Sequence, residues 1–368
     1  MIQMGCGTLE ESQALWRALF DALSVDENDD AWARWLQAEF ERRGNSRESW
    51  NPSALPVETD LPIEDKSAFN YPAKQFVIDL SAVIEAKGAM TRRQWVSLLE
   101  AVIRIGAAAH VLWLCGLNSR LWNVVHGILA GSEMANPSCA EDVRNEIFTP
   151  DTHYLSYGNL AVPPIRDLAS GYLTSRLGLN AIFWELEDLG FSLTTLNSAE
   201  DIVHVLQLIR THRAQLISLG TLRKFQDLSD VHARTLACKK GIGSNLLEFS
   251  RYTLGKRQTA DQTLRSYDQG YVLNKRGTAK SAPWVLSLGP VALLAIVHCC
   301  LREYSGPRSV KHLSKHLALY GINVGVNDIG TSDLGRELRM LGLILDSPDA
   351  ESGILLVPPF NIVRRGNA

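Results

Sequence analysis

The sequence predicts a mainly α protein, in which a multi-helix body precedes a C-terminal domain of three helices and a β-hairpin. Apolar residues recur at helical spacing along most of the chain, and the alternation typical of strands is rare before residue 340. A turn-rich basic segment then interrupts the helical pattern. We therefore expect a body at residues 1–266, with a possible sub-boundary near 132–165, a basic linker at 267–283 and a C-terminal domain at 284–368.

Charge is distributed unevenly along the 368-residue chain. The formal net charge of −3 gives no overall indication of nucleic-acid binding. However, residues 1–70 contain 14 acidic and 6 basic side chains, whereas residues 234–280 contain 10 basic and 3 acidic ones. This asymmetry predicts an acidic end for a protein partner and a basic strip for a polyanion. A solvated surface, with the two ends matched to each other, explains it equally well.

The N-terminus and the cysteines bear on where the protein functions. The start of the chain, MIQMGCGTLEESQ, has no basic region followed by an apolar stretch, so it does not resemble a signal peptide. The six cysteines form no CxxC pair. His298, Cys299 and Cys300 are consecutive and would point about 100° apart on a helix, so they cannot share one ion. We expect reduced thiols, a cytoplasmic location, no metal and no cofactor.

The body is predicted as a series of amphipathic helices. The first are Leu9–Leu23 and Asp30–Glu41, followed by a proline-containing loop at 44–72 and by Ala73–Ala86, Arg92–Val111 and Leu121–Leu129. After the loop-rich residues 132–167 we expect Leu168–Ser175, Asn180–Asp188, Ser198–Ile217, Leu222–Leu236, Asn245–Tyr252 and Ala260–Ser266. Thr91, Ser119 and Ser198 are the expected N-caps, and Ser198 has Asp201 at capping-box spacing.

The most apolar window of the chain is Val102–Leu117. It carries Arg104 and His110, and it is shorter than the roughly 20 apolar residues that a membrane-spanning helix needs. It therefore predicts a buried core helix, and we expect no membrane association.

The C-terminal domain contains three helical runs followed by a strand–turn–strand pattern. The runs are Pro290–Glu303, Ser309–Tyr320 and Ser332–Leu341, and the strand pattern is LGLILD, an acidic turn and ILLVPPF. The expected core positions are Leu293, Leu294, Ile296, Val297 and Leu301 in the first run, Val310, Leu313, Leu317 and Tyr320 in the second, and Leu334, Leu338 and Leu341 in the third. Gly321 is the expected terminator of the second helix.

This order of elements resembles the winged helix-turn-helix superfamily. The resemblance covers only the C-terminal domain, and it implies a third helix that enters the major groove of DNA. Arg336 and Arg339 would then face the bases, and Lys311 and Lys315 would contact the backbone. The turn of the wing carries three acids and no base, which disfavours a grip on phosphate. A protein-binding role is therefore as well supported as DNA contact.

A second group of basic residues, the basic strip, precedes this domain. Tyrosines are interleaved with its cations, a pattern that suits base stacking and phosphate neutralisation if the fold brings the residues together. With the cations of the C-terminal domain, the candidate nucleic-acid-binding residues are Lys239, Lys240, Arg251, Lys256, Arg257, Arg265, Lys275, Arg276, Lys280, Lys311, Lys315, Arg336 and Arg339. The interleaved tyrosines are Tyr252, Tyr267 and Tyr271. The alternative is a solvated face.

Catalytic signatures are weak in this sequence. Asp151 and His153 lie in a polar loop without a second carboxylate at defined spacing, and the glycines near residues 241–245 do not match a phosphate-binding loop. We therefore expect no enzymatic activity and no catalytic residues.

The chain contains nine tryptophans, and four of them lie within the first 50 residues beside acidic side chains. They suit either core packing or a face that docks another protein.

The sequence thus predicts a non-catalytic DNA-binding accessory or targeting subunit of a larger DNA-handling assembly, for example in antiviral defence or a mobile element. It would bind protein partners through its acidic, Trp-rich N-terminus. The alternative is a structural adaptor whose winged helix contacts only protein.

Overall fold

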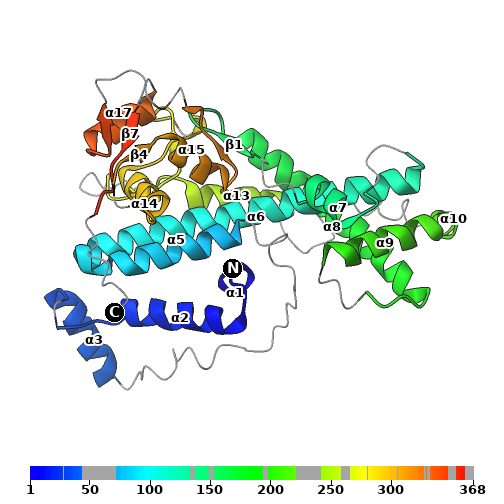
Figure 1. Cartoon of the computed structure of the whole chain (residues 1–368), viewed down its shortest axis with the longest axis horizontal. Coiled ribbons are helices and arrows are strands. Elements are labelled where there is room, and N and C mark those ends of the chain that lie inside the picture. The colour runs from blue at the N-terminus through cyan, green and yellow to red at the C-terminus, as the bar shows by residue number, and fades with distance from the viewer. Residues whose placement is uncertain are drawn as a thin grey trace.

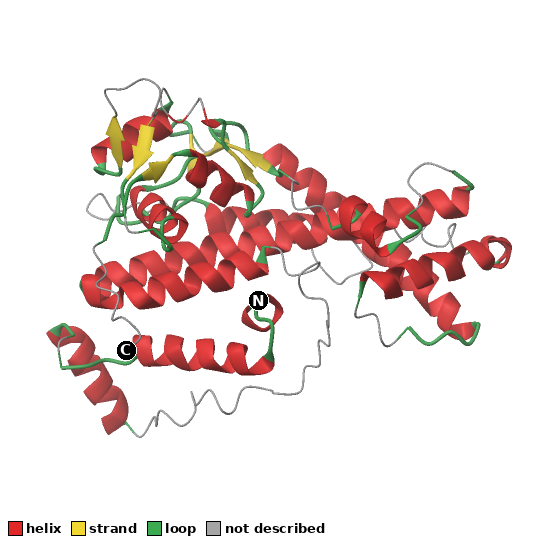
Figure 2. Ribbon diagram, viewed as in Figure 1, coloured by secondary structure: helices red, strands yellow, loops and turns green. Residues whose placement is uncertain are grey.

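A computed structural model describes most of the chain and shows a mainly helical protein with a few short strands (Figures 1 and 2). The described residues are 1–27, 29–43, 72–132, 137–148, 153–193, 198–220, 242–257, 266–279, 281–304, 306–326, 329, 332–346 and 354–360.

The elements follow one another in this order. The helices of the first half are α1 (Ile2–Gly5), α2 (Leu9–Leu23), α3 (Ala31–Arg42), α5 (Ala73–Glu85), the 3-10 helix η3 (Ala86–Ala89), α6 (Arg92–Ala130) and α7 (Ala140–Glu146). The later helices are α8 (Val162–Asp188), α9 (Ala199–Thr211), α10 (Arg213–Ser218), α13 (Ile242–Leu254), α14 (Pro290–Cys300), α15 (Lys311–Ala318) and α17 (Asp333–Met340). The strands are β1 (Leu155–Ser156), β2 (Leu273–Lys275), β3 (Trp284–Leu286), β4 (Arg308–Ser309), β5 (Ile322–Asn323), β6 (Ile344–Asp346) and β7 (Ile354–Leu356).

Helix α6 is the axis of the molecule (Figure 1). It begins at a capping box formed by Thr91 and Gln94 and ends at Gly131, whose φ of 77° lies in the left-handed region. Helices α5, α8, α13 and α14 all pack against it. By length and composition α6 could cross a membrane, but 72% of its most apolar window is buried inside the protein. It is therefore the core helix that the window Val102–Leu117 predicts.

Two predicted helix breaks are wrong, because side chains that signal a terminus make tertiary contacts instead. Helix α6 runs unbroken through Ser119, whose hydroxyl lies 3.3 Å from that of Ser175 in α8. Helix α8 likewise joins the two helices expected between Leu168 and Asp188. Gly178 lies in its middle because a Cβ there would come within 2.4 Å of the Trp122 ring.

The described residues form two hydrophobic cores, one toward each end of α6. The first contains the N-terminal half of α6 with α1, α2, α5, α14, α15, α17, the start of α8, the end of α13 and most of the strands. The second contains the C-terminal half of α6 with α7, α8, α9 and α10. In Figure 1 helices α7, α9 and α10 lie at the right-hand end of α6, away from the strands, whereas α8 runs toward them from beside β1. Helix α6 thus supports both groups of elements, and α8, which packs along it, also contributes to both cores.

The three C-terminal helices bury most of the positions that the sequence predicts, whereas Leu294 and Leu341 are only partly buried. Leu293, Ile296 and Val297 of α14 are fully buried, as are Leu334 and Leu338 of α17. In the second run, the expected stripe is also buried: Val310, Leu313, Leu317 and Tyr320. Gly321 follows with a φ of 73°, which confirms its role as a helix terminator.

Within the described residues, three small sheets accompany these helices. Strands β4, β7 and β6 form an antiparallel sheet with β7 in the centre, in which Leu356 pairs with both Arg308 and Ile344. Strands β2 and β3 form a hairpin, and β1 pairs in parallel with β5. Because β1 precedes α8 and β5 follows α15, this last pair joins distant parts of the chain.

The predicted linker at residues 267–283 is packed rather than exposed at its centre. Val272 and Leu273 are fully buried, and β2 contributes to the same core as α6 and α14. The backbone N–H of Val272 also donates to the carbonyl oxygen of Leu254 at the end of α13. The hydrophobic core therefore runs across the predicted boundary, and the division into domains stays a prediction about independent folding.

A buried carboxylate connects α5 to the C-terminal helices. Asp79 is fully buried, and its Oδ2 lies 2.9 Å from His316 Nε2 and accepts a hydrogen bond of 2.7 Å from the Tyr320 hydroxyl. Its Oδ1 accepts a hydrogen bond from Gln75 within α5. Nearby, His298 Nε2 lies 3.0 Å from the carbonyl oxygen of Ala82. Polar contacts thus fix α14 and the α15 segment on α5 in addition to apolar packing.

Replacing Asp79 with alanine is expected to lower the free energy of unfolding by about 3 kcal/mol. The reason is that His316 and Tyr320 would keep their burial and lose their acceptor. Urea unfolding followed by circular dichroism measures the change. Asp21→Ala, at an exposed position of α2, is the control and should have little effect. Equal stabilities for the two variants would contradict this role of Asp79.

A fragment containing only residues 284–368 is expected not to fold on its own. Helix α14 is buried on nearly all sides, and in the fragment the faces that pack against α5 and α6 would be open to water. Thermal unfolding of the fragment, compared with that of the full chain, should show no cooperative transition. A sharp transition would instead establish residues 284–368 as an independent domain.

Candidate functional site

Helix α13 positions the first of the predicted cations. It packs against α6 and α8 through a buried face that includes Ser250 and Leu254, which leaves Arg251 and Tyr252 toward the surface. The chain then leaves the helix along β2, where the N–H of Lys256 donates to the carbonyl oxygen of Leu273 over 2.7 Å. Lys256 is therefore held against the β2–β3 hairpin by main-chain hydrogen bonds.

A glycine lets the hairpin approach this helix end closely. A Cβ at Gly255 would lie 2.3 Å from the carbonyl oxygen of Arg251 and 3.1 Å from the Trp284 ring. The indole of Trp284, at the start of β3, therefore packs directly on the glycine backbone. The Lys275 ammonium lies 5.4 Å from the centroid of the same ring, within the range of a cation–π interaction.

These residues surround a surface pocket of about 370 Å³. Its walls are formed by Glu248, Arg251, Tyr252, Gly255, Lys256, Arg257, Tyr267 and Trp284. We call this the α13 pocket. Three of the predicted cations and two of the interleaved tyrosines meet here, although they come from α13 and from two segments that follow it.

The two tyrosine rings of the α13 pocket are open to solvent, whereas Trp284 is half-buried. Tyr252 is 81% exposed and Tyr267 is 52% exposed. Neighbouring exposed aromatic side chains on a pocket wall are typical of binding surfaces, because a ligand can cover their faces. The aromatic content and the concave shape together favour a planar ligand.

The pocket carries more positive than negative charge. Arg251 pairs with Glu248 on the same helix at 2.8 Å, and Arg257 pairs with Glu100 of α6 at the same distance. The ammonium of Lys256 lies 5.0 Å from the centroid of the Tyr271 ring. Because the two arginine–glutamate pairs are partly exposed, they contribute little stability, and their arginines can exchange partners with an incoming anion.

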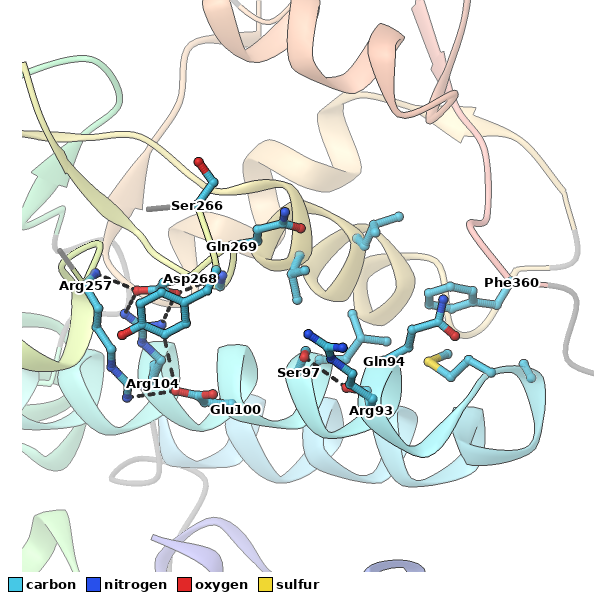
Figure 3. Close-up of a pocket in the computed structure, with 17 residues that line it drawn as sticks. Arg93, Gln94, Ser97, Glu100, Arg104, Arg257, Ser266, Asp268, Gln269 and Phe360 are labelled. Carbon is cyan, nitrogen blue, oxygen red and sulfur yellow. Dashed lines mark hydrogen bonds and ion pairs between the residues drawn. The ribbon is translucent and has the colours of Figure 1, made fainter. Parts of the chain in front are cut away.

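A larger groove of about 830 Å³ begins beside the α13 pocket and shares Arg257 and Tyr267 with it. Figure 3 shows this groove between α6 and the segment that carries Ser266 to Gln269. Arg93 and Gln94 line it on the α6 side, and Phe360 lies at its far end (Figure 3).

A buried ion pair fixes the wall between the groove and the α13 pocket. Arg104 of α6 donates to both carboxylate oxygens of Asp268, and also to the carbonyl oxygens of Thr253 and Gly255 at the end of α13. Burial alone would raise the pKa of Asp268. Hydrogen bonds from Arg104 and from the backbone of Arg257 outweigh that effect, so the pKa lies below its ordinary value. The ionised pair thus holds α13, the 268–270 turn and α6 together.

The remaining predicted cations lie elsewhere or outside the described residues. Lys311 and Lys315 are exposed on α15, and Arg336 and Arg339 are exposed on α17. In Figure 1 α17 lies apart from α13. Arg276 is exposed just after β2. Outside the described residues are Lys239, Lys240, Arg265 and Lys280.

Helix α17 has a mixed charge pattern. Arg336 pairs with Asp333 one turn earlier. Glu337 faces inward, and burial, followed by the carboxylate of Asp333, raises its pKa above the ordinary value. The acidic turn expected between β6 and β7 lies outside the described residues, apart from the backbone of Asp346.

The N-terminal helix α3 provides a second candidate surface. It buries none of its residues, and Trp32, Trp35, Leu36 and Phe40 are between 45% and 73% exposed. The rings of Trp32 and Trp35 meet edge to face at 5.8 Å. Trp50 and Asp151 lie outside the described residues, and His153 is exposed.

Several residues that form or support the site carry no recognisable pattern in the sequence. They are Trp284 on the pocket wall, and Glu100 and Asp268, which pair with arginines beside it. Arg104 was a usable signal, because a charged side chain within an apolar helix requires a buried partner.

Comparison of the chain with protein-family models, with curated proteins and with solved structures finds no match.

Replacing Asp268 with asparagine is expected to lower the free energy of unfolding at pH 7 by about 3 kcal/mol, because Arg104 would keep its charge in a buried place. Since the folded-state pKa of Asp268 is depressed, its contribution is fully present above the ordinary value of 3.8 and is lost as the pH falls through the folded value. The difference between the two proteins should therefore narrow below about pH 4. Urea unfolding at several pH values measures it.

The control for this prediction is Asp333→Asn, which breaks an exposed ion pair and should change stability little. A difference between wild type and Asp268→Asn that stays constant with pH would contradict the ionised pair.

Proposed function

We propose that this chain is a non-catalytic DNA-binding accessory or targeting subunit of a larger DNA-handling assembly, such as those of bacterial defence or mobile elements. The observation that carries the proposal is the α13 pocket, where Arg251, Lys256 and Arg257 meet Tyr252 and Tyr267. Cations neutralise phosphates, and aromatic faces stack on bases. The basic residues of the sequence suit nucleic-acid binding only if the fold brings them next to the tyrosines, and in the α13 pocket it does so.

The order of the C-terminal elements supports a winged helix-turn-helix as part of this proposal. The order α14, β4, α15, β5, α17, β6 and β7, with β7 between β4 and β6, is the order that we associate with that fold apart from β5, which pairs with β1. Helix α17 then takes the position of the recognition helix and offers Arg336 and Arg339 to DNA.

The second candidate function is a protein-binding adaptor, and α3 favours it. Its exposed residues Trp32, Leu36 and Phe40 recur every four residues, so they share one face of the helix. Such a face fits a hydrophobic groove on another protein. In α17, Asp333 offsets the charge of Arg336, and Met340 is 73% exposed, which suits protein contact better than phosphate contact. An accessory subunit would use both surfaces.

The test of DNA binding compares wild type with Lys256→Ala/Arg257→Ala in fluorescence anisotropy on a labelled duplex at two salt concentrations. We expect salt-dependent binding by wild type and roughly tenfold weaker binding by the variant. The slope of log affinity against log salt should fall by about 2, because two phosphate contacts are lost. The matched control is Arg42→Ala/Arg43→Ala, which removes two exposed arginines from α3 and its C-cap.

Arg336→Ala/Arg339→Ala tests the contribution of α17 in the same assay. Weaker binding supports a recognition helix, whereas unchanged affinity leaves DNA binding to the α13 pocket and assigns α17 to protein contact. If wild type binds no duplex and no single strand even at low salt, DNA binding by this chain is refuted, and the adaptor becomes the leading function.

A further inference from the structure

The shape of the α13 pocket specifies more than a general affinity for polyanions. A flat basic surface would suffice for the outside of a duplex, where phosphates are the accessible groups. Here the cations border a recess of about 370 Å³ whose walls include the rings of Tyr252, Tyr267 and Trp284. Bases in a duplex are covered by their neighbours in the stack and cannot present a face to such rings.

We propose that the α13 pocket binds one unpaired nucleotide of a single-stranded nucleic acid, with the base against Tyr252 and Tyr267 and the phosphate against Lys256 and Arg257. This proposal rests on the proposed function, since it names the form of nucleic acid that the same site takes. Stacking on tyrosine is available to every base, so the site selects for strandedness rather than for sequence.

The positions of the cations suit a phosphate at the rim of the pocket. Lys256 lies beside the Tyr271 ring, and no carboxylate among the described residues lies within 4.0 Å of its ammonium group. The side chain of Arg257 is 46% exposed and that of its partner Glu100 is 44% exposed, so a phosphate can replace the carboxylate at low cost. Both cations come directly after α13, next to Tyr252 on its last turn.

The adjoining groove can hold the nucleotides that follow the bound one along the nucleic acid. It shares Tyr267 and Arg257 with the α13 pocket and carries Arg93 on its α6 side (Figure 3). The carboxylate of Asp268 on its wall is neutralised by Arg104 and so does not repel a passing phosphate. A short oligonucleotide should therefore bind more tightly than a mononucleotide.

The experiment measures binding of the full chain to three labelled probes by fluorescence anisotropy. The probes are a short oligothymidylate, an oligouridylate of equal length, and a duplex with the same number of phosphates. The variants are Tyr252→Ala/Tyr267→Ala and, as the matched control, Tyr252→Phe/Tyr267→Phe, which keeps both rings. Thermal unfolding checks that each variant is folded, as expected for exposed positions.

We expect wild type to prefer a single strand to the duplex. The alanine variant should bind single strands roughly tenfold or more weakly and the duplex as before, while the phenylalanine variant resembles wild type. A difference between the two single-stranded probes distinguishes DNA from RNA as the ligand.

Two results would overturn the proposal. If the alanine variant binds single strands as wild type does, or loses single strand and duplex equally, the rings do not hold an unpaired base, although duplex binding and the proposed function can stand. If wild type binds none of the three probes, the proposed function fails and this proposal fails with it.

Discussion

The buried carboxylate of Asp79 is the constraint on which the arrangement of the first core depends. An ionisable group without exposure must be fully hydrogen-bonded, and its partners His316 and Tyr320 come from the α15 segment, far along the chain. Hydrogen bonds are directional, so these contacts constrain the placement of the α15 segment on α5 more tightly than apolar packing alone does. The contact therefore orients α14, α15 and the strands as a unit on α5 and α6.

The candidate site depends on the same principle a few turns further along α6. Arg104 joins three backbone and side-chain acceptors from α13 and the 268–270 turn, so the two sides of the α13 pocket are anchored to one side chain. Because these groups are satisfied within the wall, Arg251, Lys256 and Arg257 remain at the surface for a ligand. A rigid base below exchangeable surface pairs is the arrangement that a preformed binding site requires.

The sequence predicted the parts of the fold that local patterns determine. The apolar stripe that includes Leu313 and Leu317 and the capping box of Ser198 and Asp201 are examples, because each is encoded within a few residues. The prediction of a helix break near Gly178 was wrong, because this glycine makes room for the Trp122 ring of α6 and does not end its own helix. The short strand pairs offer too few residues for a periodic signal. The basic residues of the site could be identified from the sequence. That they lie together could not, because the ion pair that supports the site joins Arg104 to Asp268, 164 residues apart.

Helix α6 has a mechanical consequence that follows from its 39 residues. At a rise of 1.5 Å per residue it is about 58 Å long, close to twice the diameter of a small domain. One continuous hydrogen-bonded rod therefore joins the two cores and sets the spacing between them. The α9–α10 end of the molecule and the α13 pocket are thereby held apart, and a change in their separation would require α6, and α8 packed along it, to bend.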